Sequence, residues 1–315
     1  MTCPTLKPES TWRFVSQDLP SNFSTGKERR LAAIARAFLN TGRRVEFHCC
    51  LVAPPPAETW DTDLWSDFDS LVIWNLSGRE IDSNGFFECY ATESISEGCG
   101  ASLSQATFDG VVFTRIALVS PLWHCCPSSC LRVLELDEME SRRALEFVSL
   151  DYTEVSGDEK RSYAAKKMLE RRWIPEFDLV TLSSQKELAR AESLLGAPAP
   201  ENLTVWPNIV PEPPALTDSD NTEFRLLFVG HLSYAPNHDG VLWFAKEVLP
   251  LIRETYPDAR FDVIGLHCPA PLATELHELG CSFLGPQRDL LPYYRKAMTA
   301  VIPLRAGTGT RIKIL

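Results

Sequence analysis

Near its carboxyl end the sequence contains basic residues and glycines at a spacing suited to phosphate binding. The segment Arg305–Lys313 holds three basic residues and no acidic one, although the whole chain carries a formal net charge of -11. Gly307 and Gly309 allow the backbone to approach a phosphate closely, and the hydroxyl groups of the neighbouring residues Thr308 and Thr310 can donate hydrogen bonds. Two interpretations stay open: an anion pocket at the start of a helix, or a turn with solvated basic residues.

A second loop, Gly230–Asp239, lies between an apolar run that ends at Gly230 and an amphipathic stretch. The run predicts a buried parallel strand, and the apolar residues from Val241 to Ile252 recur at helical spacing. In a doubly wound sheet such a loop lies at the carboxyl end of a strand, where ligands bind. We therefore expect Gly230–Asp239 to form one wall of an active cleft.

The first loop of the chain offers a third candidate. Thr25 and Gly26 follow the apolar run Trp12–Val15 and precede a helical stretch that begins near Leu31. This position could present backbone N–H groups to an anion, or Gly26 could serve only as a turn.

Other motifs narrow the classes of function. No G-x-G-x-x-G follows the first strand, and no Walker loop, G-x-S-x-G or H-E-x-x-H occurs, which argues against dehydrogenases, ATPases and hydrolases. Asp61-Thr62-Asp63 resembles a metal-binding aspartate pair but precedes a strand, so we interpret it as a surface cap. His124 to Cys130 lacks the spacing of a zinc site, so we interpret its cysteines as buried or loop thiols and expect no metal.

Composition is that of a soluble globular protein, with 44% hydrophobic and 23% charged residues among 315. The net charge of -11 argues against nucleic-acid partners, because the protein and the nucleic acid would both carry negative charge. The sequence contains no signal peptide and no spanning apolar stretch, so we expect a cytosolic protein that could act peripherally at a membrane surface. The ten cysteines are scattered and are expected to be reduced and mostly buried.

Strand-type runs alternate with helical patterns, which predicts an α/β fold with two Rossmann-like domains of parallel sheet. A stretch rich in Pro, Asp and Glu sets the boundary near residue 215, giving domains 1–215 and 216–315. The expected strands of the first half are Trp12–Val15, Arg44–Val52, Phe68–Leu76, Phe108–Val119, Leu145–Asp151, Phe177–Leu182 and Leu203–Val205. Those of the second half are Arg225–Val229, Arg260–Ile264, Ser282–Leu284 and Ala300–Leu304.

Helices are expected at Leu31–Leu39 and Glu159–Arg172, after Gly230 with a kink at Pro250, from Pro271 to Gly280 and at Asp289–Ala297. The sequence stops about one turn into a further helix that follows Ala300–Leu304. We therefore expect the chain to be a fragment that lacks the last elements of its second domain.

Three runs together resemble a known family: FVGHLSYAPNHDGVLWFAKEVLPLI, then ARFDVIG, then VIPLRAGTGTRIKIL. They look like the carboxyl-terminal donor domain of retaining glycosyltransferases of family four (group 1), which have the GT-B fold. The resemblance is strongest from Leu226 to Leu315. It is weaker upstream, where RFVSQDLP, FDGVVFTR, FVSLDYTEV and VWPNIV fit the order of the family's acceptor domain.

The resemblance implies two facing domains, a nucleoside-diphosphate sugar as donor substrate and no separate cofactor or metal. The acceptor would be a glycan, a lipid-linked sugar or another hydroxyl compound. Arg311 and Lys313, with the backbone of residues 307–310, would stabilise the departing diphosphate. Thr25 and Gly26 would face the diphosphate and the acceptor. Arg115 and Asp151 would line the acceptor cleft, with Asp151 either orienting an acceptor hydroxyl or capping a helix.

The chain also departs from the family pattern. His231 and Asn237 stand near the places of a diphosphate-binding arginine and lysine, so Gly230, His231 and Asn237 are expected to shape the donor site instead. Thr308 replaces the first of two family glutamates, and the second would follow Leu315. We therefore expect the chain to be poorly active. Two alternatives remain open: a nucleotide-sugar epimerase of the same architecture, and a non-catalytic relative that binds glycans or nucleotides.

Overall fold

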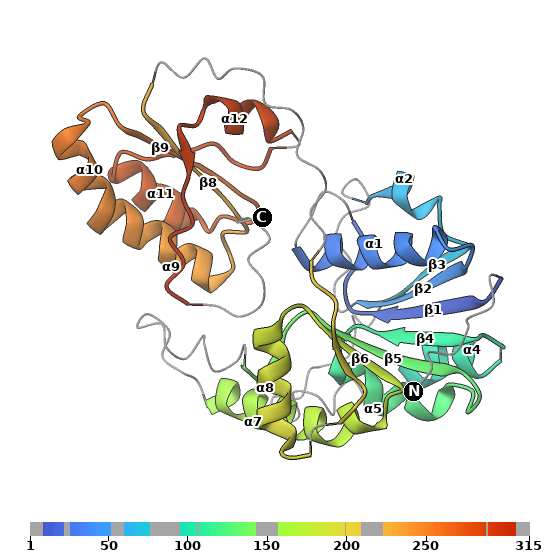
Figure 1. Ribbon diagram of the computed structural model, residues 1–315. Helices are drawn as coiled ribbons and strands as arrows, with labels where there is room; N and C mark the ends of the chain where they lie inside the picture. Colours follow the sequence, from blue (N-terminus) through green and yellow to red (C-terminus); the bar gives the residue numbers. More distant parts are fainter. Residues whose placement is uncertain are drawn as a thin grey trace. The chain divides into compact units, whose positions relative to one another are not determined.

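A computed structural model describes residues 9–21, 26–51, 60–75, 95–105, 107–142, 157–198, 200–208, 223–287 and 289–306. The described chain divides into two compact units, unit 1 through Asn208 and unit 2 from Glu223 onward (Figure 1). The predicted boundary near residue 215 lies among residues 209–222, outside the described residues.

Unit 1 is built on a parallel sheet of seven strands in the order β3-β2-β1-β4-β5-β6-β7. The strands are β1 (Thr11–Ser16), β2 (Arg44–Leu51), β3 (Ser70–Asn75), β4 (Gly110–Phe113), β5 (Leu131–Leu136), β6 (Leu179–Leu182) and β7 (Leu203–Val205). The helices are α1 (Gly26–Leu39), α2 (Thr62–Trp65), α4 (Ala101–Ser104), α5 (Val119–Leu122), α7 (Gly157–Trp173) and α8 (Gln185–Leu195).

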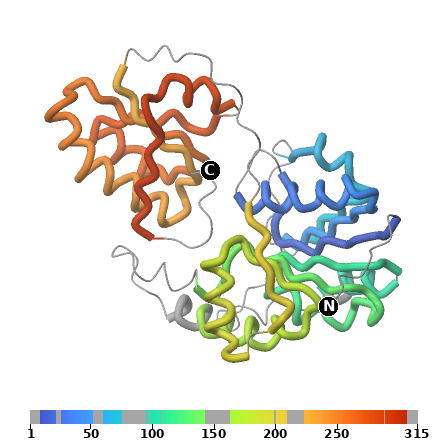
Figure 2. The backbone as a smooth tube through the Cα atoms, in the orientation of Figure 1, coloured from blue at the N-terminus to red at the C-terminus, as the bar shows by residue number. Residues whose placement is uncertain are grey.

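Both faces of this sheet are buried, because side chains along a strand point alternately to its two sides. Trp12 and Phe14 of β1 pack with α1 in one hydrophobic cluster, and Val15 belongs to a second cluster that includes residues of α5 and α8. Figure 2 traces the same path, with α1 following β1 directly. The order of the sheet reverses between β1 and β4, whose register pairs Phe14 with Val112.

Unit 2 is built on a parallel sheet of four strands in the order β10-β9-β8-β11. The strands are β8 (Arg225–Val229), β9 (Arg260–Ile264), β10 (Ser282–Phe283) and β11 (Thr299–Ala300). The helices are α9 (Ala235–Trp243), α10 (Leu249–Thr255), α11 (Ala270–Glu278) and α12 (Leu291–Lys296). A π-helical segment, Phe244–Val248, joins α9 to α10 just before Pro250, where we expected the helix to kink.

Two predicted strands are longer than the observed ones. The run Phe108–Val119 contains only β4, because the chain turns at Thr114 and continues as a 3₁₀ helix, Ile116–Leu118, and then as α5. Most residues of the run are apolar and buried on both sides of Thr114, so hydrophobicity alone could not separate the strand from the helix that follows it. The run Ala300–Leu304 contains only the end of β11, because Pro303 has no N–H to continue a ladder.

One strand was missed. Strand β5 lies in the middle of the sheet, between β4 and β6, but its sequence, LRVLEL, includes two charged residues. The predicted strand Leu145–Asp151 lies outside the described residues. Among the residues that are described, no helix is long and apolar enough to cross a membrane.

Candidate functional site

The first candidate site lies in unit 1, at the carboxyl ends of β1, β4 and β5. In an open parallel sheet, ligands bind where the strand order reverses, and here that point lies between β1 and β4. Hydrogen bonds fix the loop after β1: Ser16 Oγ donates to the Asp18 carbonyl oxygen at 2.8 Å, and Thr114 Oγ1 of the neighbouring loop donates to Ser16 Oγ at 3.0 Å. The two loops at the reversal are therefore tied together.

Arg30 of α1 and Glu135 of β5 form a buried ion pair beside this point. Arg30 Nε donates to Glu135 Oε1 at 2.6 Å, and the two side chains are only 4% and 6% exposed. A second nitrogen of the guanidinium group, Arg30 Nη1, donates to Asn208 Oδ1 at 3.0 Å. Asn208 in turn donates from its Nδ2 to Asp137 Oδ1 at 3.5 Å. Asn208 thus links the cation of α1 to the carboxylate that follows β5.

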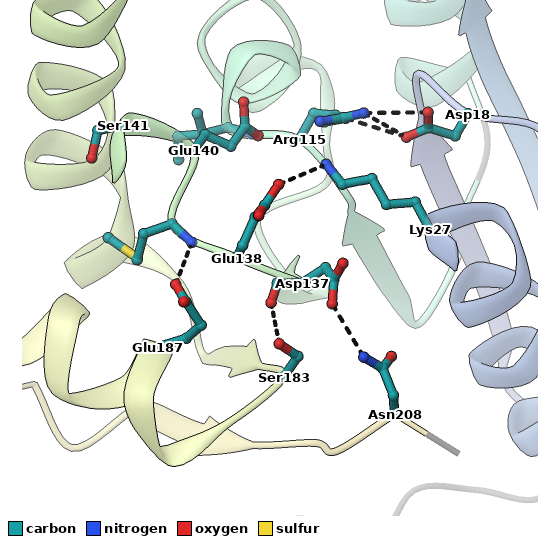
Figure 3. Close-up of polar contacts among 12 residues, drawn as sticks. Asp18, Lys27, Arg115, Asp137, Glu138, Glu140, Ser141, Ser183, Glu187 and Asn208 are labelled. Atoms are coloured by element: carbon teal, nitrogen blue, oxygen red, sulfur yellow. Dashed lines mark hydrogen bonds and ion pairs between the residues drawn. The ribbon is translucent and has the colours of Figure 1, made fainter. Parts of the chain in front are cut away.

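Two further ion pairs converge on the same edge of the sheet (Figure 3). Arg115, which follows β4, donates hydrogen bonds from Nε and Nη2 to the carboxylate of Asp18, with Nη2 at 3.0 Å from Oδ2. Lys27 Nζ lies 3.9 Å from Glu138 Oε1. In Figure 3, Asp137 and Glu138 follow one another on the segment beyond β5, with the Lys27 side chain reaching across from α1.

Burial and neighbouring charges act against each other in this cluster. Burial raises the pKa of Glu135 above its usual value, although the attraction of Arg30 works in the opposite direction. Burial also acts to lower the pKa of Arg115, but the carboxylates of Asp18 and Glu140 outweigh it and the pKa is raised. Arg115 therefore stays cationic and bound to Asp18, so its role is to fix the loop after β1.

A small cavity opens within this cluster. The space available to the centre of a water-sized sphere is about 20 Å³, which is enough for one water-sized group. Its lining residues are Asp18, Lys27, Arg30, Leu31, Thr114, Glu135 and Asp137.

The second candidate site lies in unit 2, at the carboxyl ends of β8 and β9. Here the backbones approach closely, because a Cβ atom added to Gly265 would overlap the carbonyl oxygen of Gly230. Gly230 N also donates to the Ile264 carbonyl oxygen at 3.0 Å. The loop that begins at Gly230 is therefore held against the loop after β9 by its backbone.

His231 occupies this loop and is held by its neighbours. Asn237 Nδ2 donates to the His231 carbonyl oxygen at 2.8 Å, and the ring Nδ1 of His231 lies 3.1 Å from Ser233 Oγ. The ring of His267 lies 4.8 Å from that of His231, centroid to centroid. Burial, and then the proximity of His267, lower the pKa of His231. The imidazole is therefore neutral at pH 7 and supplies hydrogen bonds instead of charge.

Asp239 and Gly240 of α9 hold the segment that follows β11. Asp239 Oδ2 accepts from Arg305 Nε at 2.9 Å, and Asp239 Oδ1 accepts from Arg305 Nη2. The carboxylate side chain is 5% exposed and the arginine side chain 43% exposed. A Cβ atom at Gly240 would overlap the carbonyl oxygen of Pro303. The Pro-Asn-x-Asp run is therefore explained locally: Asn237 fixes one loop, and Asp239 fixes the other.

The structure places only some of the predicted site residues. Gly26 is the first residue of α1, and Gly230, His231 and Asn237 lie together in unit 2. The others lie outside the described residues: Thr25, Asp151, Gly307, Thr308, Gly309, Thr310, Arg311 and Lys313. Arg305, counted as part of the basic run, forms an ion pair with Asp239.

Sequence reasoning missed the cluster of Lys27, Arg30 and Asp137. Lys27 and Arg30 lie one helical turn apart on α1, in KERR, which reads as an ordinary solvated charge run. Asp137 follows a strand that was itself missed. The one usable signal was the pair Asp137-Glu138 directly after LRVLEL, since polar residues that end a buried strand point to a site.

The rejected motifs are explained as structure. Asp61 caps α2, with Oδ1 accepting from Leu64 N at 3.3 Å, which confirms the interpretation of Asp61-Thr62-Asp63 as a cap, although Asp61 itself is buried. Cys126 and Cys130 are buried free thiols and Cys125 is partly buried. Within the described ranges, no group of three or more metal-binding side chains is found.

Comparison with known protein families finds a match for the second unit. Residues 223–315 match the family described as "Glycosyl transferases group 1". This segment contains the Gly230 loop, the Asn237 and Asp239 contacts and the segment after β11. No curated protein matches the chain in sequence.

Solved structures match the whole chain in fold. A crystal structure of TarM matches with a TM-score of 0.63 and 8% identity, covering 98% of this chain and 83% of that one. A complex of an S. aureus TarM mutant with UDP gives 0.57 and 7%, with coverages of 95% and 82%. WaaG, "a glycosyltransferase involved in lipopolysaccharide biosynthesis", gives 0.59 and 14%, with coverages of 93% and 75%. A putative UDP-N-acetylglucosamine 2-epimerase from Listeria monocytogenes gives 0.54 and 10%, with coverages of 93% and 73%.

Proposed function

Because residues 223–315 match the family of group 1 glycosyl transferases and the chain shares the GT-B fold of solved glycosyltransferases, we propose that this protein transfers a sugar from a nucleoside-diphosphate sugar to a hydroxyl group, with retention of anomeric configuration. The observation that carries the proposal lies in unit 2. There the loop that begins at Gly230 belongs to the segment that matches the family, and its backbone packs closely against Gly265 at the carboxyl ends of the central strands. UDP, which the TarM complex contains, is the first donor nucleotide to test.

In such a reaction the bond between the sugar carbon and the diphosphate oxygen breaks, a bond forms from the acceptor oxygen to the same carbon, and the proton of the acceptor hydroxyl group passes to the departing diphosphate. Negative charge grows on the departing diphosphate, so fixed hydrogen-bond donors and cations stabilise the transition state. We propose that the Gly230 loop shapes the donor site through Gly230, His231 and Asn237.

The positive charge that stabilises the departing diphosphate must come from residues outside the Gly230 loop and Arg305. His231 is neutral at pH 7 and Arg305 is paired with Asp239. This is why we assign the diphosphate contacts to Arg311 and Lys313, supported by the backbone and hydroxyl groups of residues 307–310. No metal is required by this proposal, since the two cations would take the Lewis acid's place. Thr25 and Gly26 would face the same phosphates from the start of α1.

Binding of UDP to the 315-residue chain tests this assignment by calorimetry. Arg311→Gln and Lys313→Gln should each weaken UDP binding about tenfold, as expected for loss of a hydrogen bond to a charged group. Arg295→Gln, at an exposed position of α12, removes the same charge and should leave the affinity unchanged. Equal affinities in all three variants would rule out the proposed diphosphate contacts.

Product analysis tests the reaction class. With a nucleotide sugar and a glycoside acceptor, NMR of the product should show the donor's anomeric configuration. The fold is also that of the Listeria epimerase, and interconversion of the UDP sugar without any acceptor would establish that activity instead. UDP binding with neither reaction would indicate a binding protein. Asp151→Asn should lower turnover if Asp151 orients the acceptor, and should only destabilise the protein if it caps a helix.

A further inference from the structure

Arg30 carries a buried donor that no described residue of unit 1 accepts from. The residue is 5% exposed, its Nε is bound to Glu135 and its Nη1 to Asn208. Its Nη2 is buried and has no hydrogen-bond partner among the residues that the structure describes. A buried unsatisfied N–H of a charged group is costly, so this atom calls for an acceptor oxygen from outside the protein.

The cavity beside Arg30 fits such an oxygen in size. Its space of about 20 Å³, open to the centre of a water-sized sphere, holds one hydroxyl group and is too small for a sugar ring or a phosphate. A hydroxyl group both accepts and donates one hydrogen bond. Such a group can accept from Arg30 and donate to one of the carboxylates that line the same cavity.

The charges around the cavity select the kind of group that enters. Three carboxylates line it, from Asp18, Glu135 and Asp137, against the two cations Lys27 and Arg30. Asp18 is held by Arg115 and Glu135 by Arg30 itself, whereas the contact to Asp137 Oδ1 is the long one from Asn208, at 3.5 Å. An anion would add to an existing excess of negative charge, while a neutral hydroxyl group would not. Asp137 is therefore the carboxylate with the weakest contact inside the protein, and it can accept the hydrogen bond that the hydroxyl group donates.

We propose that this cavity binds one hydroxyl group of an uncharged, polyol-like part of the acceptor, with Arg30 Nη2 as donor and Asp137 as acceptor of hydrogen bonds. The inference rests on the proposed transferase function and specifies its acceptor: a neutral sugar or other polyol at this position, and not a phosphate ester or a carboxylate.

Binding of simple probes to the 315-residue chain tests the proposal. The neutral probes are methyl α-glucoside, methyl α-galactoside and methyl α-mannoside, and the anionic probe is glucose 6-phosphate, each titrated by ligand-observed NMR with and without UDP. At least one neutral glycoside should bind, more tightly than the phosphate ester. Asp137→Asn should weaken its binding about tenfold, because a neutral amide oxygen accepts a weaker hydrogen bond than a carboxylate does.

Two further variants make the result specific. Asp67→Asn removes the same charge at an exposed position and should leave binding unchanged. Asp137→Glu keeps the charge but its extra methylene fills the cavity, so binding should also weaken. Melting curves establish that each variant is folded.

Three outcomes would overturn the proposal: tighter binding of glucose 6-phosphate, equal glycoside affinity in Asp137→Asn and Asp67→Asn, or UDP binding without any glycoside binding. The last would assign a water molecule to the cavity. UDP affinity is measured in the same samples, so loss of the proposed transferase function appears separately, as a chain that binds glycosides but no nucleotide.

Discussion

The two units share one strand order and differ in what they place at its reversal point. Unit 1 contains β3-β2-β1-β4 and unit 2 contains β10-β9-β8-β11, so in each the first strand lies between the second and the fourth. At this point unit 1 places charged side chains, tied in ion pairs such as Arg30 with Glu135. Unit 2 places close backbone contacts at Gly230 and neutral rings at His231.

The difference shows that topology fixes where a ligand binds, while the loops and the first helix fix which ligand it is. Helix α1 places Lys27 and Arg30 near the edge of the sheet, and the carboxylates beside them come from β5, from the residue after it and from the loop after β1. Helix α9 has Pro236 and Asn237 in its first turn and uses the carboxylate of Asp239 to hold another loop. Unit 1 thus places charged side chains around a small cavity, whereas unit 2 holds its loops together mainly through backbone contacts and the Asp239–Arg305 pair.

The largest expected effect comes from breaking the buried ion pair of unit 1. Arg30→Met should destabilise the protein by about 3–5 kcal/mol, because Glu135 would remain buried without its cation. Urea denaturation measures the loss. The double variant Arg30→Met with Glu135→Leu should recover most of it, since no charge then stays buried. A single variant as stable as the wild type would show that water reaches Glu135 freely.

The second-largest expected effect concerns Glu170 of α7, whose carboxyl group is hydrogen-bonded to the hydroxyl group of Ser141. Burial raises the pKa of Glu170 to about 7 from 4.5, although hydrogen bonds from the hydroxyl and backbone N–H of Ser141 act to lower it. The folded-state pKa lies above the unfolded one, so the contribution to stability is full below pH 4.5 and is lost as pH rises through 7. Over this window the loss is about 3 kcal/mol, at 1.36 kcal/mol for each pKa unit.

Glu170→Gln tests this, because glutamine is neutral throughout and can still bind Ser141. The variant should be more stable than the wild type at pH 8 and nearly equal to it at pH 4.5. Hydrogen exchange of amides in α7 and in the segment at Ser141 locates the effect in unit 1. A stability difference that does not change with pH would contradict the raised pKa.

Breaking the corresponding ion pair of unit 2 should cost less. Arg305 is 43% exposed, so water can solvate part of what its removal leaves. Arg305→Met should destabilise the protein by about 1–2 kcal/mol, since the largely buried Asp239 loses a charged partner. Denaturation alongside Arg30→Met measures the contrast directly. A cost equal to that of Arg30→Met would mean that the two reversal points do not differ in burial.

The same contrast explains what the sequence could predict. Strand β8 is short, apolar and followed by glycine, so its place and its loop were predictable, including His231 and Asn237. Strand β5 was not, because Glu135 looks like a surface residue until Arg30, 105 positions earlier, is brought against it. Local patterns report local burial, and an ion pair between distant segments leaves no periodic signal. The charged cluster of unit 1 was therefore missed, whereas the position of the Gly230 loop at the end of β8 was predicted.

The smallest expected effect concerns the neutral histidine of unit 2. Because burial and His267 lower the pKa of His231, this residue becomes charged only as pH falls below 6.5. If UDP binds beside it, the affinity for UDP should rise below that pH, and His231→Gln should abolish about a threefold gain, as expected for a weak, partly exposed charge contact. Titration calorimetry between pH 5 and 8 measures this, with His124→Gln, at an exposed position of unit 1, as control. The substitution His231→Arg should extend the gain in UDP affinity to pH 8, since arginine keeps its charge there. Equal pH profiles for the wild type and His231→Gln would place the diphosphate away from this loop, and the contrast between the two reversal points would then rest on unit 1 alone.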